Sequence, residues 1–159
     1  MNAVPRNPRL AYRQAAVETA TPLGLVVILY DLAIEDCRKS IAAINSADVQ
    51  GRTNAVQHAF QVIEQLQGRL DFEKGGEVAK QLDRFYSMVR GKLLEAQIKC
   101  SRQIFEEVIG FLWEMRQTWK QVEEQCAGEQ GAPAAPGPAA IRVMAPAPTE
   151  AQPSGVWSA

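Results

Sequence analysis

The stretch LDFEKGGEVAKQL, Leu70–Leu82, decides how this chain folds. Two adjacent glycines, Gly75 and Gly76, lie between segments in which apolar residues recur every three or four positions, the spacing of an amphipathic helix. Glycine reaches the left-handed backbone conformation that ends many helices without steric cost, and Gly75 is the residue we expect to adopt it. The stretch therefore predicts a turn that folds one helix back against the next.

The charges beside the glycines also suit a turn. Lys74 would stand at the negative end of the preceding helix, and Glu77 at the positive end of the following one. A phosphate-binding loop is the alternative, because a lysine and free backbone amides attract anions. The P-loop pattern, however, needs four residues between its glycines, then Lys and Ser or Thr, after a strand, and none of this is present. We therefore interpret Asp71, Lys74, Gly75, Gly76 and Glu77 as a structural turn between helices.

Helical periodicity continues on both sides of this turn. Thr21 is a suitable N-cap, and Pro22 a suitable first residue, for a helix that should reach about Asn45. Asp48 and Ser101 can cap the second and fourth helices. The apolar stripes of the second, third and fourth helices comprise Val49, Val56, Ala59, Ile63, Leu66 and Leu70; Val78, Leu82, Phe85, Val89, Leu93 and Ala96; and Ile104, Val108, Leu112, Met115, Trp119 and Val122. No segment alternates with a period of two, so no strand is expected.

A chain of 159 residues suffices for one domain with a substantial core. Four helices of roughly 20 to 25 residues, joined by short links, pack as antiparallel neighbours. We therefore expect an all-α, antiparallel four-helix bundle over residues 21–126, with residues 1–20 as an N-terminal arm or short helix that caps it. Residues 127–159 are dense in Ala, Pro and Gly and nearly free of charge, so we expect a disordered C-terminal tail.

The composition excludes several classes of protein. The net charge is −1, whereas a nucleic-acid-binding surface usually shows a basic excess. The longest apolar run, Leu23–Tyr30, is much shorter than the roughly 20 residues of a membrane span, and the N-terminus lacks the apolar core of a signal peptide. The three cysteines do not have the spacing of a disulfide framework or a zinc site. We expect a soluble, cytoplasmic protein that neither binds nucleic acid nor inserts into a membrane.

The sequence offers no arrangement of catalytic or metal-binding side chains. A di-iron bundle uses two Glu-x-x-His pairs, whereas His58 is the only histidine and has no correctly spaced glutamate. Nucleophilic triads lack support for the same reason. The carboxylate pairs at 106–107 and 123–124 are sequence neighbours that point in different directions on a helix, so we expect them to be solvated. We predict no enzyme activity, no cofactor and no metal site; a small bundle enzyme or metal carrier is the alternative.

The first helix has more apolar surface than a bundle requires. In the segment LVVILYDLAI, residues 25–34, only Asp31 is polar. A helix at the rim of a bundle needs an apolar sector of only about 100°. Either the N-terminal arm covers the excess, or another protein does, since large exposed apolar patches usually mark interaction sites.

Four stretches resemble, in order and spacing, the FliS family of flagellin-specific export chaperones: AYRQAAVETATPLGLVVILYDLAIEDCRKSI, LDFEKGGEVAKQLDRFYSMV, LLEAQIK and EEVIGFLWEMRQTWKQ. The resemblance covers roughly Ala11 to Gln125. It implies an antiparallel bundle with an N-terminal cap and no enzyme activity. It also implies a cytoplasmic protein that binds the C-terminal segment of flagellin, prevents its premature polymerisation and supports its delivery to the flagellar type III export apparatus. A regulatory adaptor that binds another flagellar regulator through the same groove is the alternative.

The resemblance also implies roles for individual residues. Tyr12 matches the family's capping tyrosine, Leu25–Asp31 its apolar helix segment, and Asp71 with residues 74–77 its inter-helix turn. On this basis the expected flagellin-binding residues are Tyr12, Leu25, Ile28, Leu29, Tyr30 and Leu32.

Overall fold

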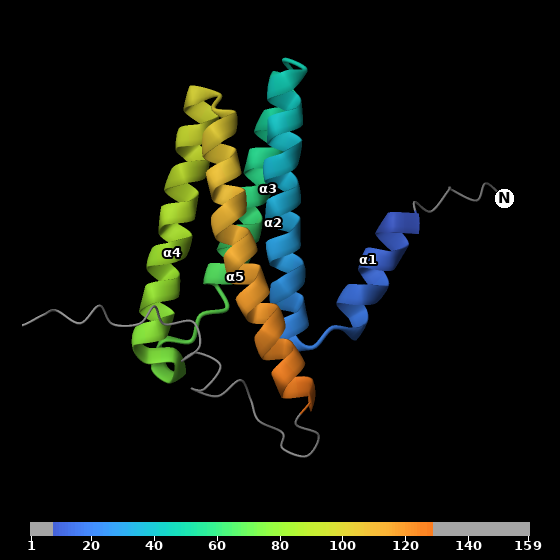
Figure 1. Ribbon diagram of the computed structural model, residues 1–159, viewed down its shortest axis with the longest axis vertical. Helices are drawn as coiled ribbons and strands as arrows, with labels where there is room; N and C mark the ends of the chain where they lie inside the picture. Colours follow the sequence, from blue (N-terminus) through green and yellow to red (C-terminus); the bar gives the residue numbers. More distant parts are fainter. Residues whose placement is uncertain (1–7, 129–159) are drawn as a thin grey trace, which may run out of the picture.

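The computed structural model describes residues 8–128, and these residues form five helices (Figure 1). The helices are α1 (Pro8–Thr19), α2 (Pro22–Asn45), α3 (Val49–Gln67), α4 (Phe72–Lys99) and α5 (Arg102–Gly128). Helices α2 to α5 form an antiparallel bundle in which α2 and α4 each pack against both α3 and α5. The expected all-α bundle with a short N-terminal helix is confirmed. The expected tail lies outside the described residues, except that Ala127 and Gly128 continue α5.

Side-chain caps begin α2 and α3 where the sequence predicts them. The Oγ1 of Thr21 accepts a hydrogen bond from the backbone N–H of Gly24 at 2.9 Å, and Pro22 follows as the first residue of α2. The carboxylate of Asp48 accepts from the N–H of Gly51 at 2.8 Å at the start of α3. These bonds stabilise the helix starts, because the first N–H groups of a helix have no intrahelical partner.

The turn between α3 and α4 lies earlier than the glycines suggest. Helix α3 ends at Gln67, and α4 begins at Phe72 because the carboxylate of Asp71 accepts hydrogen bonds from the N–H groups of Glu73 and Lys74, at 3.0 and 2.9 Å. Lys74 therefore lies in the first turn of α4 and not at the end of the preceding helix. The prediction that Gly75 ends a helix in the left-handed conformation is wrong.

Gly76 is the glycine with the unusual backbone. Its φ is 50° and its ψ is −127°, so it interrupts α4 with a kink immediately before Glu77. A side chain strongly disfavours this region, and glycine reaches it at low cost because it has no Cβ. The stretch that predicts a reversal of the chain thus holds a short capped turn followed by a glycine kink.

Replacing Gly76 by alanine is expected to lower the free energy of unfolding by about 1–2 kcal/mol, the cost of a strained backbone conformation. No atom lies within 4 Å of an added Cβ at Gly76 or at Gly91, so neither alanine meets a steric clash. Gly91→Ala is the matched control, and it is expected to stabilise α4 by about 0.5–1 kcal/mol through helix propensity. Urea unfolding followed by circular dichroism measures both. If Gly76→Ala and Gly91→Ala stabilised the protein equally, Gly76 would not have the non-helical backbone conformation that makes the kink.

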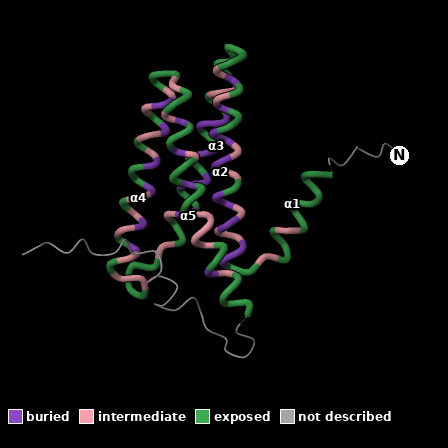
Figure 2. Tube along the Cα trace, in the orientation of Figure 1, coloured by how far each residue is buried: buried purple, intermediate pink, exposed green. Residues whose placement is uncertain are grey.

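The core lies between the four bundle helices (Figure 2). Most of the predicted stripe positions are buried, whereas Val49 is 62% exposed and was wrongly placed in a stripe. At the centre the hydroxyls of Tyr30 and Tyr86 are 2.8 Å apart, so each buried hydroxyl has a hydrogen-bond partner. Burial raises the pKa of Tyr86 to about 12. Helix α2 contributes several side chains to the core, and Leu32 also packs against it, whereas Leu25 and Ile28 are half-buried and lie outside the cluster.

Candidate functional site

Two adjoining cavities, of about 590 and 470 Å³, lie between α1 and α2. They share Tyr12, Ala16 and Ile28, and together we name them the α1–α2 groove. Its lining consists of Pro8, Arg9, Tyr12, Arg13, Ala15, Ala16, Thr19, Ala20, Gly24, Val27, Ile28, Asp31, Leu32 and Glu123. Aliphatic and aromatic side chains dominate the lining, and its charged groups are the carboxylates of Asp31 and Glu123 and the guanidinium groups of Arg9 and Arg13.

Helix α1 stands off the bundle and buries none of its residues (Figure 1). The exposed fractions of Leu10, Tyr12 and Val17 are 57%, 78% and 45%. An ion pair between Arg13 and Glu35 of α2 joins this helix to the bundle. The N-terminal helix therefore does not cover the excess apolar surface of α2, and the groove is open to a ligand.

Three of the six predicted binding residues meet in this groove. Tyr12 comes from α1, and Ile28 and Leu32 come from successive turns of α2. Both Ile28 and Leu32 are half-buried, so part of each side chain is free for contact.

The other three predicted residues lie elsewhere. Leu25 is half-buried on α2 but lines neither cavity. Leu29 is only 6% exposed, and Tyr30 is fully buried against Tyr86, so both face the core. Sequence reasoning did not separate them from Ile28, because a helix that is apolar nearly all round carries no signal for which stripe faces inward.

Sequence reasoning missed the residues of α5 that border the groove. The guanidinium of Arg116 donates to both carboxylate oxygens of Asp31, at 2.8 and 3.1 Å, and lies 5.4 Å from the centre of the Trp113 ring. These hydrogen bonds raise the pKa of Arg116. Near the start of α2, the hydroxyl of Thr21 donates to Glu123 at 2.9 Å. These pairs join residues that are 85 and 102 positions apart, so no local pattern could reveal them.

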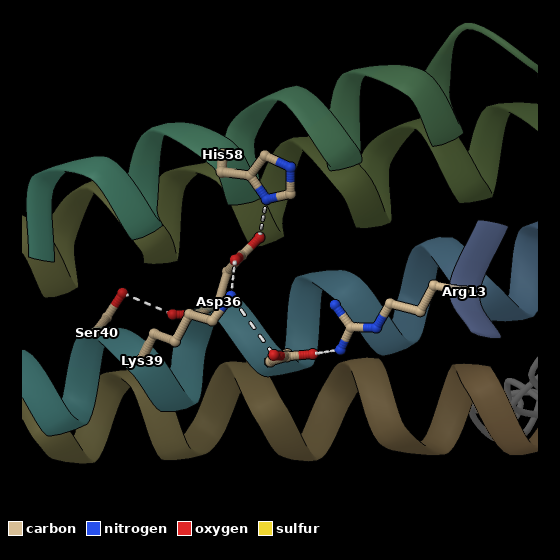
Figure 3. Close-up of polar contacts among 6 residues, drawn as sticks. Arg13, Asp36, Lys39, Ser40 and His58 are labelled. Atoms are coloured by element: carbon tan, nitrogen blue, oxygen red, sulfur yellow. Dashed lines mark hydrogen bonds and ion pairs between the residues drawn. The ribbon is translucent and has the colours of Figure 1, made fainter. Parts of the chain in front are cut away.

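A chain of polar contacts connects α1 with α3 across α2 (Figure 3). Glu35 pairs with Arg13, and it lies 3.5 Å from the ammonium of Lys39. Lys39 is 3.8 Å from the buried carboxylate of Asp36, which accepts a 2.6 Å hydrogen bond from His58 Nδ1. Burial acts to raise the pKa of Glu35, but Arg13 and Lys39 lower it overall. Burial raises the pKa of Asp36, against the opposing effects of His58 and Lys39.

The raised pKa of Asp36 predicts a pH-dependent contribution to stability. An acid whose pKa is higher in the folded state is favoured in its protonated form, so its stabilising contribution is lost as the pH rises from its ordinary pKa through the raised one. Asp36→Asn removes this titration while keeping the shape of the side chain. The asparagine variant should therefore gain stability relative to the unmodified protein as the pH rises from 3 to 7. Urea midpoints of the two proteins across that range measure the difference in stability. If the asparagine variant instead lost stability relative to the unmodified protein as the pH rose to 7, the His58 contact would have a larger effect on the charged carboxylate than burial has.

The groove is suited to binding a peptide. Amphipathic helices and extended segments dock in apolar grooves, where their side chains supply the anchors. Within residues 8–128 no cluster of three or more His, Cys, Asp or Glu side chains could hold a metal ion. None of the helices in the same range combines the length and the apolar character that crossing a membrane requires.

The chain is similar to a family of known proteins. The model of the family described as flagellar protein FliS matches residues 5–126. The flagellar secretion chaperone FliS of Salmonella typhimurium is 31% identical over 125 residues, which cover 76% of this chain and 93% of the relative. The chaperone of the same name from Bacillus subtilis is 29% identical, with 73% and 86% covered. FliSB of Pseudomonas aeruginosa is 28% identical, with 67% and 84% covered.

The family match covers α1 to α4 and α5 as far as Cys126, including the groove residues of α1 and α2 and Glu123 of α5. The chain therefore belongs to the FliS family of flagellar secretion chaperones, a family that is non-enzymatic.

Proposed function

We propose that this protein binds the C-terminal segment of flagellin in the α1–α2 groove within the bacterial cytoplasm. Bound there, the segment is kept from premature polymerisation and is delivered with the chaperone to the flagellar type III export apparatus. The observation that carries the proposal is the apolar groove beside α2, which α1 leaves open because none of its residues is buried. Membership of a family of secretion chaperones supplies the class of ligand.

The groove has the features that a folding peptide needs. A segment that orders on binding loses conformational entropy, so it must bury a large apolar area in return. Tyr12 on one wall, and Ile28 and Leu32 on the other, offer apolar contacts from two separate helices. Because α1 has few contacts of its own to lose, it can close over the bound segment at little cost in packing.

Calorimetric titration with a synthetic flagellin C-terminal peptide tests the proposal. We expect 1:1 binding and a rise in melting temperature. At a free peptide concentration of 100 times Kd the stabilisation should be about 2.7 kcal/mol. A scrambled peptide of the same composition is the control. Absence of both heat and thermal shift with the native peptide would overturn the proposed function.

A further inference from the structure

The chain leaves the described part of the molecule at the end of the α1–α2 groove. Glu123 lines the groove and is hydrogen-bonded to Thr21 at the start of α2. Helix α5 ends at Gly128, little more than one turn later. Figure 1 shows the end of α5 beside the start of α2 and the end of α1. Residues 129–159 therefore begin next to the groove.

Large apolar side chains occur at two places in residues 129–159. These are Ile141–Met144, with the sequence IRVM, and Val156–Trp157. Arg142, within the first of them, is the only lysine or arginine of the segment. Pro138 and Pro146 lie on either side of IRVM.

The first apolar cluster is within reach of the groove. Thirteen peptide steps separate residue 141 from residue 128, and an extended chain spans at most about 45 Å over that number. Helix α2, with 24 residues, is about 36 Å long, and Ile28 lies only two turns from its start. The chain between residues 128 and 141 is therefore long enough for Ile141 to reach Ile28 without being fully extended.

Charge favours the first cluster over the second. Among the described residues Glu123 is the one charged residue that lines the cavity beside the end of α5, whereas Arg9 and Arg13 line the other cavity together with Asp31. Arg142 supplies a guanidinium between apolar neighbours. The Glu123 carboxylate accepts a hydrogen bond from Thr21 and has room for further donors. Val156 and Trp157 have no basic residue beside them.

We propose that Ile141–Met144 binds in the α1–α2 groove of its own molecule when flagellin is absent, and that it competes with flagellin for that site. In an extended segment Ile141 and Val143 share one face, which packs on Ile28 and Leu32, while Arg142 turns to the carboxylate of Glu123. The competition rests on the proposed function, whereas the contact itself does not. A tethered segment acts at an effective concentration of about 1 mM, so a contact with a Kd of about 0.2 mM would weaken flagellin binding about sixfold.

Cross-linking within one molecule tests the contact without flagellin. Cys100 and Cys126 are exposed and are changed to serine, whereas Cys37 is buried, and burial raises its pKa to about 12, so it stays unreactive. In this background Tyr12→Cys is combined with Val143→Cys, and a short bis-maleimide is added to the full chain. The matched control combines Tyr12→Cys with Val156→Cys. We expect at least about fivefold more intramolecular product with the cysteine at 143.

Flagellin binding tests the competition. In the full chain, Ile141→Ser with Val143→Ser should lower the Kd of the flagellin C-terminal peptide about three- to tenfold. The control variant, Val156→Ser with Trp157→Ser, should leave that Kd unchanged. Both are measured by calorimetry at the same ionic strength.

Each remaining outcome overturns a stated part of the proposal. Equal cross-linking from 143 and 156 rejects the assignment to Ile141–Met144, and cross-linked dimers place the segment on a second copy of the chain. Preferred cross-linking from 143 with an unchanged flagellin Kd rejects the competition. Preferred cross-linking without any flagellin binding leaves the contact standing and overturns the proposed function instead.

Discussion

Ile28→Glu is expected to leave the protein folded and to weaken flagellin-peptide binding more than tenfold, whereas Leu29→Glu is expected to unfold it. Ile28 is half-buried and lines both cavities of the groove, so a glutamate there can turn its carboxylate to water while removing apolar contact with the ligand. Leu29 is 6% exposed and belongs to the core. An unpaired carboxylate at that position costs about 5 kcal/mol or more, which is comparable to the whole stability of a small domain.

Circular dichroism and calorimetry separate the two outcomes. The Ile28→Glu variant should keep its helical signal and a cooperative melting transition, and its loss of affinity should exceed about 1.4 kcal/mol. Ile28→Leu is the conservative control, and it should restore binding. A folded Leu29→Glu variant would show that Leu29 is not a core residue. A folded Ile28→Glu variant with unchanged affinity would place the flagellin site outside the α1–α2 groove.

Phe105→Ala is expected to lower the free energy of unfolding by about 3–5 kcal/mol, the cost of a large cavity in a well-packed core. Phe105 is fully buried near the start of α5, in the same cluster as Val108 and Leu112. Phe111 lies on the same helix and is 37% exposed. Phe111→Ala should cost only about 1 kcal/mol or less, since its ring is already partly in water and alanine is the better helix former.

Urea unfolding of both variants measures the difference. The comparison holds the residue type, the helix and the substitution constant, so the difference reports which face of α5 is turned inward. Similar costs for the two phenylalanines would mean that Phe105 does not face the core more closely than Phe111.

The apolar periodicity of α5 predicted some of its buried residues and not others. Apolar residues spaced three and four apart correctly identified Val108, Leu112 and Val122 as buried, because this spacing is a property of the helix itself. The same reasoning passed over Phe105, which precedes Val108 by three residues and is fully buried. With apolar residues at both 104 and 105, the local pattern allows either phase, and packing against the other helices decides between them.

The position of the turn between α3 and α4 was predicted wrongly for a different reason. The pair Gly75–Gly76 correctly signals a break in regular helix, but the break is a kink at Gly76, and the chain reverses before Asp71. Asp71 competes successfully as a cap because its carboxylate satisfies two free N–H groups at once, whereas a glycine only permits a conformation. The start of α4 is therefore set by the hydrogen-bond acceptor Asp71, and not by Gly75 four positions later.

By itself the sequence determined the all-α class, the starts of α2, α3 and α5, the antiparallel order of the bundle and the family, because these depend on local spacing, capping groups and motifs. Only the tertiary structure decided which side of α2 is free. It turned Leu29 and Tyr30 into the core and left Ile28 and Leu32 beside α1. It also placed Glu123 of α5 in the groove lining and paired Arg116 with Asp31. The physical reason is that α2 is apolar nearly all round, so its orientation is set by the fit of Tyr30 against Tyr86 and by ion pairs with distant residues, which no local pattern records.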